Sequence, residues 1–331
     1  MLVSILIPAY NAERWIAETI ASALNQTWPQ TEIVVVDDGS SDGTLAVARR
    51  FASPSVKVVG QAHAGASVAR NRALAEAQGE YVQWLDADDL LARDKISLQL
   101  DALRATGNPR TLLSSAFGIF YWRPAKARFL RTPIWEDLEP LEYLRRSFSQ
   151  NLWMSPAAWL VSRELTDRAG RWDERLSLND DGEYFCRIVA ASERVQFVTG
   201  ARCYYRRSGP AQLSRTCDRR AQQSLALSLL LSVDRLLALE DSVRTRTAAL
   251  QFLEHCSPWF LPHSLDLVQP IARRLGGAIA VPPANLKEKV AQIVLGQDLG
   301  SRVLAAGRRA RLVAAVKWDR LCYRVTPTCP L

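Results

Sequence analysis

Residues 80–89 read EYVQWLDADD, an apolar run that ends in a cluster of carboxylates. The run predicts a buried strand, and Asp86, Asp88 and Asp89 follow at the point where it leaves the core. Like charges this close repel and raise one another's pKa unless a cation or hydrogen-bond donors compensate. A solvated turn is the alternative, because aspartate is common in turns and at helix caps. The surrounding sequence has to decide between a turn and a site.

Strand and helix patterns alternate through the first hundred residues, with short connections between them. Besides 80–85, continuous apolar runs predict buried strands at 3–10 (VSILIPAY), 32–38 (EIVVVDD) and 56–60 (VKVVG). Helices are expected after Asn11, over 44–52 and over 65–78. Strands that alternate with helices imply a parallel sheet with right-handed crossovers, so the predicted fold class is α/β.

Two helix starts are assigned to capping side chains. Asn11 is a candidate cap for the first helix. In that helix, apolar residues recur at a spacing of four, which predicts one buried face formed by Ile16, Ile20 and Leu24. Asp89 is interpreted as the cap of a helix that starts directly after it, and this interpretation leaves it out of the candidate site.

Polar motifs follow three of the predicted strands at their carboxyl ends. They are PAYN at 8–11, DDGSSDG at 37–43 and DADD at 86–89. In open α/β sheets, ligands bind in the crevice outside the carboxyl ends of the strands. Accidental turns would not need to collect acids on one rim of the sheet. The pattern therefore favours a ligand site over a solvated turn.

Beyond residue 110 the pattern loosens. Two strands, predicted to be antiparallel, flank the turn RPAK and cover 111–122 and 126–135. A helix at 138–148, a loop leading into a strand within 151–165, a helix from Glu183 and strands within 195–207 follow. From about 216 onward the chain reads as helix, interrupted by PWFLP at 258–262 and VPPAN at 281–285. We predict a catalytic domain over 1–215, with halves at about 1–110 and 111–215, and a basic helical region over 216–331.

Composition excludes several classes of protein. The chain has 331 residues, 48% of them hydrophobic and 23% charged, as in ordinary globular proteins. No apolar run approaches the roughly 18 residues that span a bilayer, and MLVSILIPAY lacks the basic leader of a signal peptide. The six cysteines show neither a disulfide nor a zinc spacing, so reduced thiols in a cytoplasmic protein are expected.

Basic charge is concentrated in the last third of the chain. Residues 1–200 carry 22 basic and 25 acidic side chains, whereas 201–331 carry 20 and 9. Nucleic acid, an anionic membrane surface or a solvated arginine-rich surface would each explain this bias. We predict no nucleic-acid partner. The segment 302–325 combines basic and apolar positions and is expected to hold the protein at the inner face of the membrane without crossing it. Packing of this helix on the catalytic domain is the alternative.

Five segments together resemble the family-2 glycosyltransferases, inverting enzymes with the GT-A fold. The segments are SILIPAYN, EIVVVDDGSSDGT, HAGASVARNRAL, GEYVQWLDADD and RWDERLSLNDDGEYFCR, in the family's order and spacing over roughly 3–207. The resemblance implies a Rossmann-like, mostly parallel sheet flanked by helices. It also implies a nucleotide-sugar donor (UDP- or dTDP-linked favoured), Mg²⁺ or Mn²⁺ as cofactor, and a glycan or lipid-linked acceptor.

The resemblance carries a nucleotide site onto named positions. Pro8, Ala9 and Tyr10 occupy the places that line the nucleobase pocket, where Tyr10 can stack on the base. Asp38 matches the acid that accepts a hydrogen bond from the uracil or thymine imide, and Arg70 falls where a basic or amide side chain approaches the nucleotide. Taken alone, Tyr10 would be interpreted as a core tyrosine and Arg70 as a surface residue.

The same resemblance implies a metal site and a catalytic base. Asp86, Ala87 and Asp88 match the D-x-D motif, in which Asp86 binds the ribose or assists the metal and Asp88 ligates it. A hard dication takes oxygen ligands, and one or two carboxylates suffice when substrate phosphates and water supply the rest. Asp181 matches the general base, with Asp180 as the alternative, since Asp180 and the following Gly182 depart from the family's usual residues.

Two further features bear on the kind of transfer and on the acceptor. QLSRT at 212–216 resembles the Q-x-x-R-W motif of processive synthases but ends in Thr216, so transfer of single sugars is expected. Trp153, Trp159 and Trp172 are candidates for a sugar-stacking wall, or else core tryptophans.

The alternative functions are a nucleotidyltransferase and a catalytically degenerate nucleotide-sugar-binding protein. PAYN holds no glycine, which speaks against the phosphate loop of the first. The presence of all the candidate acids, Asp38, Asp86, Asp88 and Asp181, speaks against the degenerate binding protein. A dinucleotide oxidoreductase is excluded, because no G-x-G-x-x-G follows the first strand.

Overall fold

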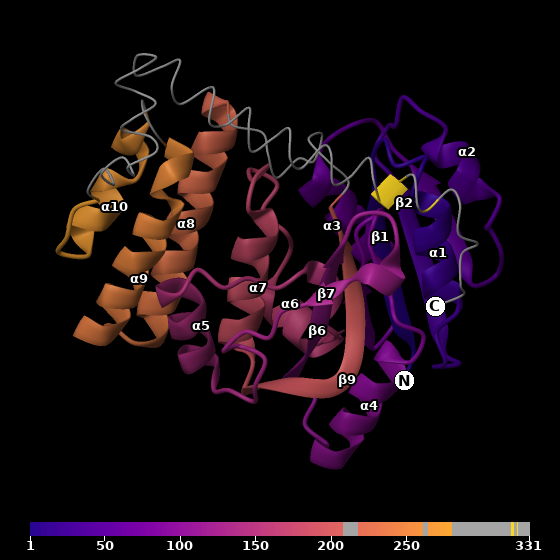
Figure 1. Cartoon of the computed structure of the whole chain (residues 1–331), viewed down its shortest axis with the longest axis horizontal. Coiled ribbons are helices and arrows are strands. Elements are labelled where there is room, and N and C mark those ends of the chain that lie inside the picture. The colour runs from indigo at the N-terminus through magenta and orange to yellow at the C-terminus, as the bar shows by residue number, and fades with distance from the viewer. Residues whose placement is uncertain (208–217, 261–263, 280–318, 321–322, 324–331) are drawn as a thin grey trace.

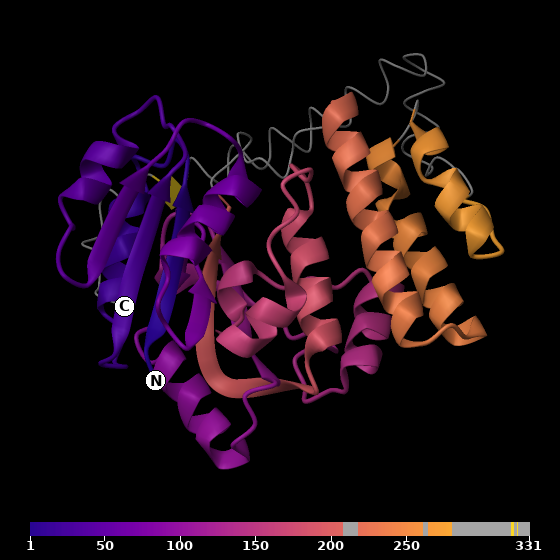
Figure 2. The ribbon, with the colours of Figure 1, turned by 180° about the vertical axis from the view of Figure 1, so that it is seen from behind.

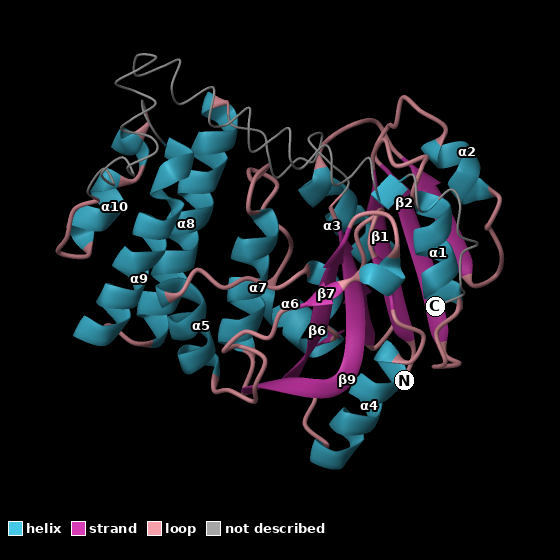
Figure 3. Cartoon of the chain, viewed as in Figure 1, coloured by secondary structure: helices cyan, strands magenta, loops and turns pink. Residues whose placement is uncertain are grey.

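Two sheets and a row of helices make up the fold, which is known from a computed structural model (Figure 1). The structure describes residues 1–207, 218–260 and 264–279, together with 319, 320 and 323. The sheets lie at one end of the molecule and the row of helices at the other, with α7 (Asp180–Ala191) standing between them in the front and back views (Figures 1 and 2). Figure 3 shows the same division by secondary structure.

The first sheet has five strands, four of which are parallel. Its order is β3-β2-β1-β4-β8, and β8 is antiparallel to β4. The strands are β1 (Val3–Ala9), β2 (Thr31–Asp37), β3 (Val56–Gly60), β4 (Tyr81–Trp84) and β8 (Val161–Ser162). Nearly all side chains of β1 and β4 are buried, as expected for parallel strands covered on both faces. The predicted mostly parallel α/β sheet is confirmed.

The helices of this half are α1 (Ile16–Leu24), α2 (Thr44–Arg49), α3 (Ala66–Glu76) and α4 (Lys95–Thr106). The capping prediction for Asn11 is wrong, because Trp15 occupies the N-cap position of α1. Asn11 adopts a φ of 48° and accepts a hydrogen bond from Ser41 N at 2.8 Å, so it holds the turn after β2 instead. Leu24 is 44% exposed, so the buried face of α1 does not extend to its last turn.

The capping prediction for Asp89 is also wrong. The strand β5 (Leu90–Leu91) follows Asp89, and the next helix, α4, starts only at Lys95. Asp89 is fully buried, and its carboxylate accepts hydrogen bonds from Arg206 N at 2.8 Å and Ser155 Oγ at 3.3 Å. A buried acid with two donors thus links the turn to the second sheet.

The second sheet has the order β5-β9-β6-β7. Its longer strands are β6 (Thr111–Phe120) and β9 (Arg194–Arg206), which run parallel to each other. The short β7 (Arg128–Phe129) returns antiparallel to β6 after a 3-10 turn at Pro124–Lys126, as predicted. The segment expected to form several last strands is one long strand, β9. Gly200, at a φ of 96°, lies where its pairing with β6 is interrupted, between Phe197 and Arg202.

Helices cover the remaining described chain. They are α5 (Pro140–Ser149), α6 (Arg163–Ala169), α7, α8 (Arg219–Leu239), α9 (Val243–Cys256) and α10 (Gln269–Arg274), with short 3-10 helices at Pro156–Ala158, Ser257–Phe260 and Leu265–Leu267. Helix α7 starts three residues before the predicted Glu183, so Asp180 and Asp181 lie in its first turn. Acids are favourable there because they face the positive end of the helix dipole.

Helices α8 and α9 pack on the preceding part of the chain. Helix α8 lies along α7, and α9 lies along α5, where the rings of Phe148 and Phe252 stack at 4.2 Å. Leu229 and Leu253 are fully buried in the same apolar core as the sheets. The helical prediction is confirmed for the described part of this region, and a domain boundary near 215 stays a prediction.

Several predicted features fall outside the described residues. QLSRT at 212–216, VPPAN at 281–285 and all of 302–325 except positions 319, 320 and 323 belong to them. Asp319, the one acid of 302–325, accepts hydrogen bonds from Trp122 N at 2.8 Å and Arg123 Nε at 2.7 Å. Within the described chain, every helix is too short or too polar to cross a bilayer.

Candidate active site

Most of the predicted site residues lie in two groups along the carboxyl edge of the first sheet, while Arg70 lies on α3 and Asp181 on α7. One group is formed where β1 and β2 end, since Asp38 N donates to Ala9 O at 2.8 Å. The other follows β4 and contains Asp86 and Asp88, both partly exposed, with Ala87 buried between them. The carbonyl of Ala87 accepts a hydrogen bond from Thr19 Oγ1 of α1 at 2.9 Å. This bond fixes residues 86–89, the acidic turn, to the neighbouring helix.

Arg70 joins the acids after β4 to those at the start of α7. Its side chain is 8% exposed and donates from Nη1 to Asp180 Oδ2 at 2.5 Å and from Nη2 to Asp86 Oδ1 at 3.0 Å. The guanidinium lies 4.4 Å from the ring centre of Trp172. Burial alone would lower the pKa of Arg70, but Asp180, Asp86 and Asp181 raise it above its ordinary value. The expectation that Arg70 alone would be a surface residue is therefore wrong.

Asp181, beside Asp180, has a carboxylate with a raised pKa. Burial, followed by the charges of Asp180 and Asp86, raises its pKa to about 6, although Arg70 and the N–H of Gly182 act in the opposite direction. Its Oδ1 accepts that N–H at 2.9 Å. Its neighbour Asp180 is ion-paired with Arg70. The two adjacent acids therefore have different surroundings, one neutralised by a cation and the other pushed toward its protonated form.

Of the two departures from the family pattern, Asp180 and Gly182, the glycine is explained by its neighbour Asn179. Asn179 precedes α7 with a φ of 57°, in the left-handed region. A Cβ at Gly182 would stand 2.4 Å from Asn179 Oδ1, so the asparagine side chain occupies the space beside residue 182. Any larger residue at 182 would have to displace it.

On the nucleotide side, Asp38 anchors the loop after β3. Its buried carboxylate accepts hydrogen bonds from Ala64 N at 2.9 Å, Gly65 N at 2.8 Å and Gln61 Nε2 at 2.8 Å, and its Oδ2 lies 2.9 Å from His63 Nδ1. This use of Asp38 was not foreseen. Its predicted contact with a nucleobase stays a prediction.

Tyr10 is 42% exposed and therefore not a core tyrosine. Its ring stacks on His63, with centroids 4.3 Å apart and planes 22° apart. His63 covers one face of the ring, so a base stacking on Tyr10 would need the other face or would displace His63. His63 begins the segment HAGASVARNRAL, but its stacking on Tyr10 was missed because the sequence does not show which side chains meet across the two loops.

Arg206 was also missed. It ends β9 with a fully buried side chain, donates from Nε to Asp88 O at 2.7 Å and pairs with Glu18 at 2.6 Å. Its guanidinium lies between the rings of Trp15 and Phe120, 4.2 and 4.4 Å from their centres. The hydrogen bond from Arg206 to the Asp88 carbonyl fixes the backbone of the acidic turn.

The donor set after β4 fits a hard dication. Asp86 and Asp88 present carboxylates at a partly exposed rim, and burial together with these two charges raises the pKa of Asp89 well above its ordinary value. This mutual repulsion is the cost that a bound cation would relieve. Within the described ranges, no group of three or more histidine, cysteine or acidic side chains could hold a metal. Two carboxylates suit Mg²⁺ or Mn²⁺ when phosphates and water complete the shell.

The three candidate tryptophans separate into two kinds. Trp159 and Trp172 are 2% exposed, and Trp172 stacks on Tyr184 at 4.0 Å, so both are core residues and cannot form a sugar-stacking wall. Trp153 is 46% exposed and packs against Phe117 and Tyr205, at 4.8 and 5.2 Å between centroids. Of the three, Trp153 alone is placed to meet a ligand.

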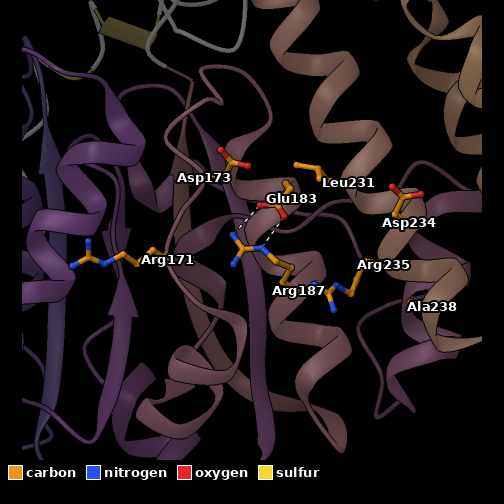
Figure 4. A pocket seen from close by; sticks show the side chains of 8 residues that line it. All are labelled: Arg171, Asp173, Glu183, Arg187, Leu231, Asp234, Arg235 and Ala238. Atoms are coloured by element: carbon orange, nitrogen blue, oxygen red, sulfur yellow. Dashed lines mark hydrogen bonds and ion pairs between the residues drawn. The ribbon is translucent and has the colours of Figure 1, made fainter.

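A pocket of about 560 Å³ opens between α7 and α8 (Figure 4). Its lining includes Glu183 and Arg187 of α7, which form an ion pair with each other, and Asp234 and Arg235 of α8. The predicted site residues do not line this pocket, and its buried acid already has a cationic partner. We therefore assign it no part in the site.

Comparisons with known proteins bear on the family and the fold. Residues 4–168 match the family model Glycosyl transferase family 2. The putative teichuronic acid biosynthesis glycosyltransferase TuaG of Bacillus subtilis is 42% identical over 103 residues, which are 30% of this chain and 41% of that protein. The UDP-Glc:alpha-D-GlcNAc-diphosphoundecaprenol beta-1,3-glucosyltransferase WfgD of Escherichia coli is 40% identical over 103 residues, 31% of this chain and 41% of that protein. The matches thus span less than half of these relatives.

Two solved structures share the fold. TarS 1-349 of S. aureus, in complex with UDP-GlcNAc, has a TM-score of 0.67 at 19% identity, over 83% of both chains. The mannosyltransferase PcManGT of Pyrobaculum calidifontis, in complex with GDP-Man and Mn2+, has a TM-score of 0.51 at 22% identity, over 96% of this chain and 87% of that one. With its GT-A fold and its match over residues 4–168, the chain belongs to glycosyl transferase family 2.

Proposed function

We propose that the protein is a metal-dependent, inverting glycosyltransferase. It would move a single sugar from a UDP- or dTDP-linked donor to a hydroxyl of a glycan or lipid-linked acceptor, in cell-surface polysaccharide synthesis. The observation that carries the proposal is the bridge of Arg70, which makes one cluster of Asp86 after β4 and Asp180 at the start of α7. The relatives TuaG and WfgD, named for teichuronic acid biosynthesis and for transfer from UDP-Glc to a diphosphoundecaprenol-linked sugar, support the pathway and the UDP-linked donor.

On the donor side, Pro8, Ala9, Tyr10 and Asp38 are proposed to hold the nucleobase, at the adjoining ends of β1 and β2. Asp86 and Asp88 are proposed to hold Mg²⁺ or Mn²⁺. When bound, such an ion would offset the charge that grows on the diphosphate as the sugar departs. Clamped by Arg206 at the Asp88 carbonyl and by Thr19 at the Ala87 carbonyl, the acidic turn needs no rearrangement of its backbone to present both carboxylates.

Asp181 is proposed as the general base. The acceptor hydroxyl would attack the anomeric carbon while the bond from that carbon to the phosphate oxygen breaks, and its electron pair would leave with the nucleoside diphosphate. Asp181 would take the hydroxyl proton. A pKa of about 6 suits a base that is charged at neutral pH yet close to the working pH. Asp180 suits the role less well, because its Oδ2 pairs with Arg70 and also lies 3.3 Å from the Ser67 hydroxyl.

A binding screen tests the proposal most directly. Thermal-shift and calorimetric titrations with UDP, dTDP, GDP and CMP, each with and without Mn²⁺, should single out one diphosphate that binds only with the metal. Transfer or slow hydrolysis of the matching nucleotide sugar should follow. Release of pyrophosphate from a nucleoside triphosphate and a sugar phosphate would instead identify a nucleotidyltransferase. Binding without any turnover would identify a degenerate binding protein.

A further inference from the structure

We propose that Ser224 and Ser228 of α8 are positioning residues for the base assigned above, an inference that rests on the proposed function. Both serines are buried, and they lie one turn apart on the helix. Ser224 Oγ accepts hydrogen bonds from Ser177 N at 2.7 Å and Leu178 N at 3.0 Å. One hydroxyl of α8 thus satisfies two successive backbone N–H groups of the loop that leads into α7.

Ser228 holds the next residue of that loop. Its hydroxyl accepts from Asn179 Nδ2 at 2.7 Å and donates to Asn179 O at 2.8 Å. Asn179 makes no side-chain cap bond to its own helix, and its Nδ2 is directed to Ser228. A left-handed backbone at a residue other than glycine is unfavourable unless its surroundings hold it. The two hydrogen bonds with Ser228 stabilise this backbone conformation from outside the loop.

The loop is held from its other side as well. Ser67 Oγ of α3 donates to Leu176 O at 3.1 Å. Residues 176–179 are therefore tied between α3, which also carries Arg70, and α8. Asp180 and Asp181 follow immediately, so the direction in which α7 starts, and with it the position of the Asp181 carboxylate, depends on these bonds. Proximity effects make such positions matter, since small misplacements of a catalytic group cost rate.

Gly182 completes the arrangement. Because a Cβ there would overlap the Asn179 amide, glycine leaves the room that lets Asn179 reach Ser228. Helix α8 lies beyond residue 168, where the family match ends. The helical region thus contributes to the chemistry by fixing the start of α7, in addition to burying apolar surface.

The test compares Ser224→Ala, Ser228→Ala and the double variant with Ser232→Ala in the full chain. Ser232 is a matched control, because it is buried one turn further along α8. Its backbone carbonyl accepts a hydrogen bond from the Cys186 thiol at 3.8 Å, and alanine keeps that carbonyl. Amide hydrogen exchange of peptides spanning 176–186 should accelerate in the first three variants and stay at the wild-type rate in the control. Gly182→Ala should accelerate it too.

Kinetic measurements then distinguish a positioning role of the serines from a general loss of stability. Hydrolysis of UDP-GlcNAc or UDP-glucose with Mn²⁺ should show kcat reduced tenfold or more in Ser228→Ala, while the dissociation constant of UDP with Mn²⁺ changes less than twofold. Ser232→Ala should match the wild type in both. Unchanged exchange in Ser224→Ala and Ser228→Ala would overturn the inference whatever the activity, and faster exchange with unaltered kcat would overturn the positioning role. A wild type that binds UDP with Mn²⁺ but turns over no donor would refute the proposed function, and the exchange rates would still decide whether the serines hold the loop.

Discussion

Replacing Asp181 with asparagine should stabilise the protein at neutral pH. The substitution keeps the shape of the side chain and removes a negative charge that lies among Asp180 and Asp86 in a partly buried site. A carboxylate whose pKa moves from 3.8 to about 6 on folding is less favourable in its charged form by about 3 kcal/mol, since each pKa unit corresponds to about 1.4 kcal/mol. Solvent that reaches the partly exposed group reduces this, so we expect a gain of about 2–3 kcal/mol in the free energy of unfolding at pH 7.5.

The gain should depend on pH in a defined direction. The folded-state pKa of Asp181 lies above the unfolded one, so protonation of this group stabilises the fold at low pH. The contribution is complete below about pH 4 and is lost as the pH rises through 6. The wild type loses this stabilisation as Asp181 becomes charged, whereas Asp181→Asn has a neutral side chain at every pH and keeps it. The difference between the two should therefore shrink by about half between pH 7.5 and pH 5 and approach zero near pH 4.

Urea denaturation of both proteins across this pH range, with a chelator present to exclude cations, measures the difference. Asp180→Asn serves as the matched control one residue away. It removes an ion-pair partner of the buried Arg70 and should lower the free energy of unfolding. A destabilised Asp181→Asn at pH 7.5, or a difference that does not change with pH, would refute the account of charge repulsion at this site.

Three further predictions concern function. Asp88→Asn should abolish the metal-dependent binding of a nucleoside diphosphate in calorimetry while the fold survives, and unchanged metal-dependent affinity would remove Asp88 from the metal site. Asp181→Asn should keep donor affinity near normal and lower turnover about a hundredfold or more, the range for loss of a general base; if Asp180→Asn behaves in this way and Asp181→Asn does not, Asp180 is the base. The full chain should float with anionic liposomes at low salt through 302–325, whereas a chain ending near residue 300 should not, and an unbound full chain would exclude the membrane role.

The sequence was sufficient to predict the first sheet and the acids at its edge. Continuous apolar runs such as the one at 3–9 are needed for strands that are buried on both faces, and strand ends place polar residues on one rim. Asp86, Asp88 and Asp181 could be proposed as site residues because each belongs to a short local motif, and their roles stay predictions. Ala87 follows from the same motif.

Long-range side-chain partners could not be predicted in this way. Asp89 looks like a helix cap in sequence, and its burial depends on Arg206 and Ser155, which lie far along the chain. Ser224 and Ser228 occupy ordinary positions of an apolar helix, and their meaning depends on which loop packs against it. Periodicity predicts which residues lie on the same face of a helix or strand, but it does not predict which segment packs against that face.

Arg70 has a consequence for how this protein can change during evolution. One guanidinium neutralises acids from two separate segments, so Arg70, Asp86 and Asp180 form a single electrostatic unit. Loss of the arginine alone would leave two carboxylates facing each other, and loss of one acid would alter the charge balance around the other. Substitutions at these three positions should therefore appear together in descendants of this lineage. A neutral residue at position 70 should be accompanied by the loss of at least one of the two acids.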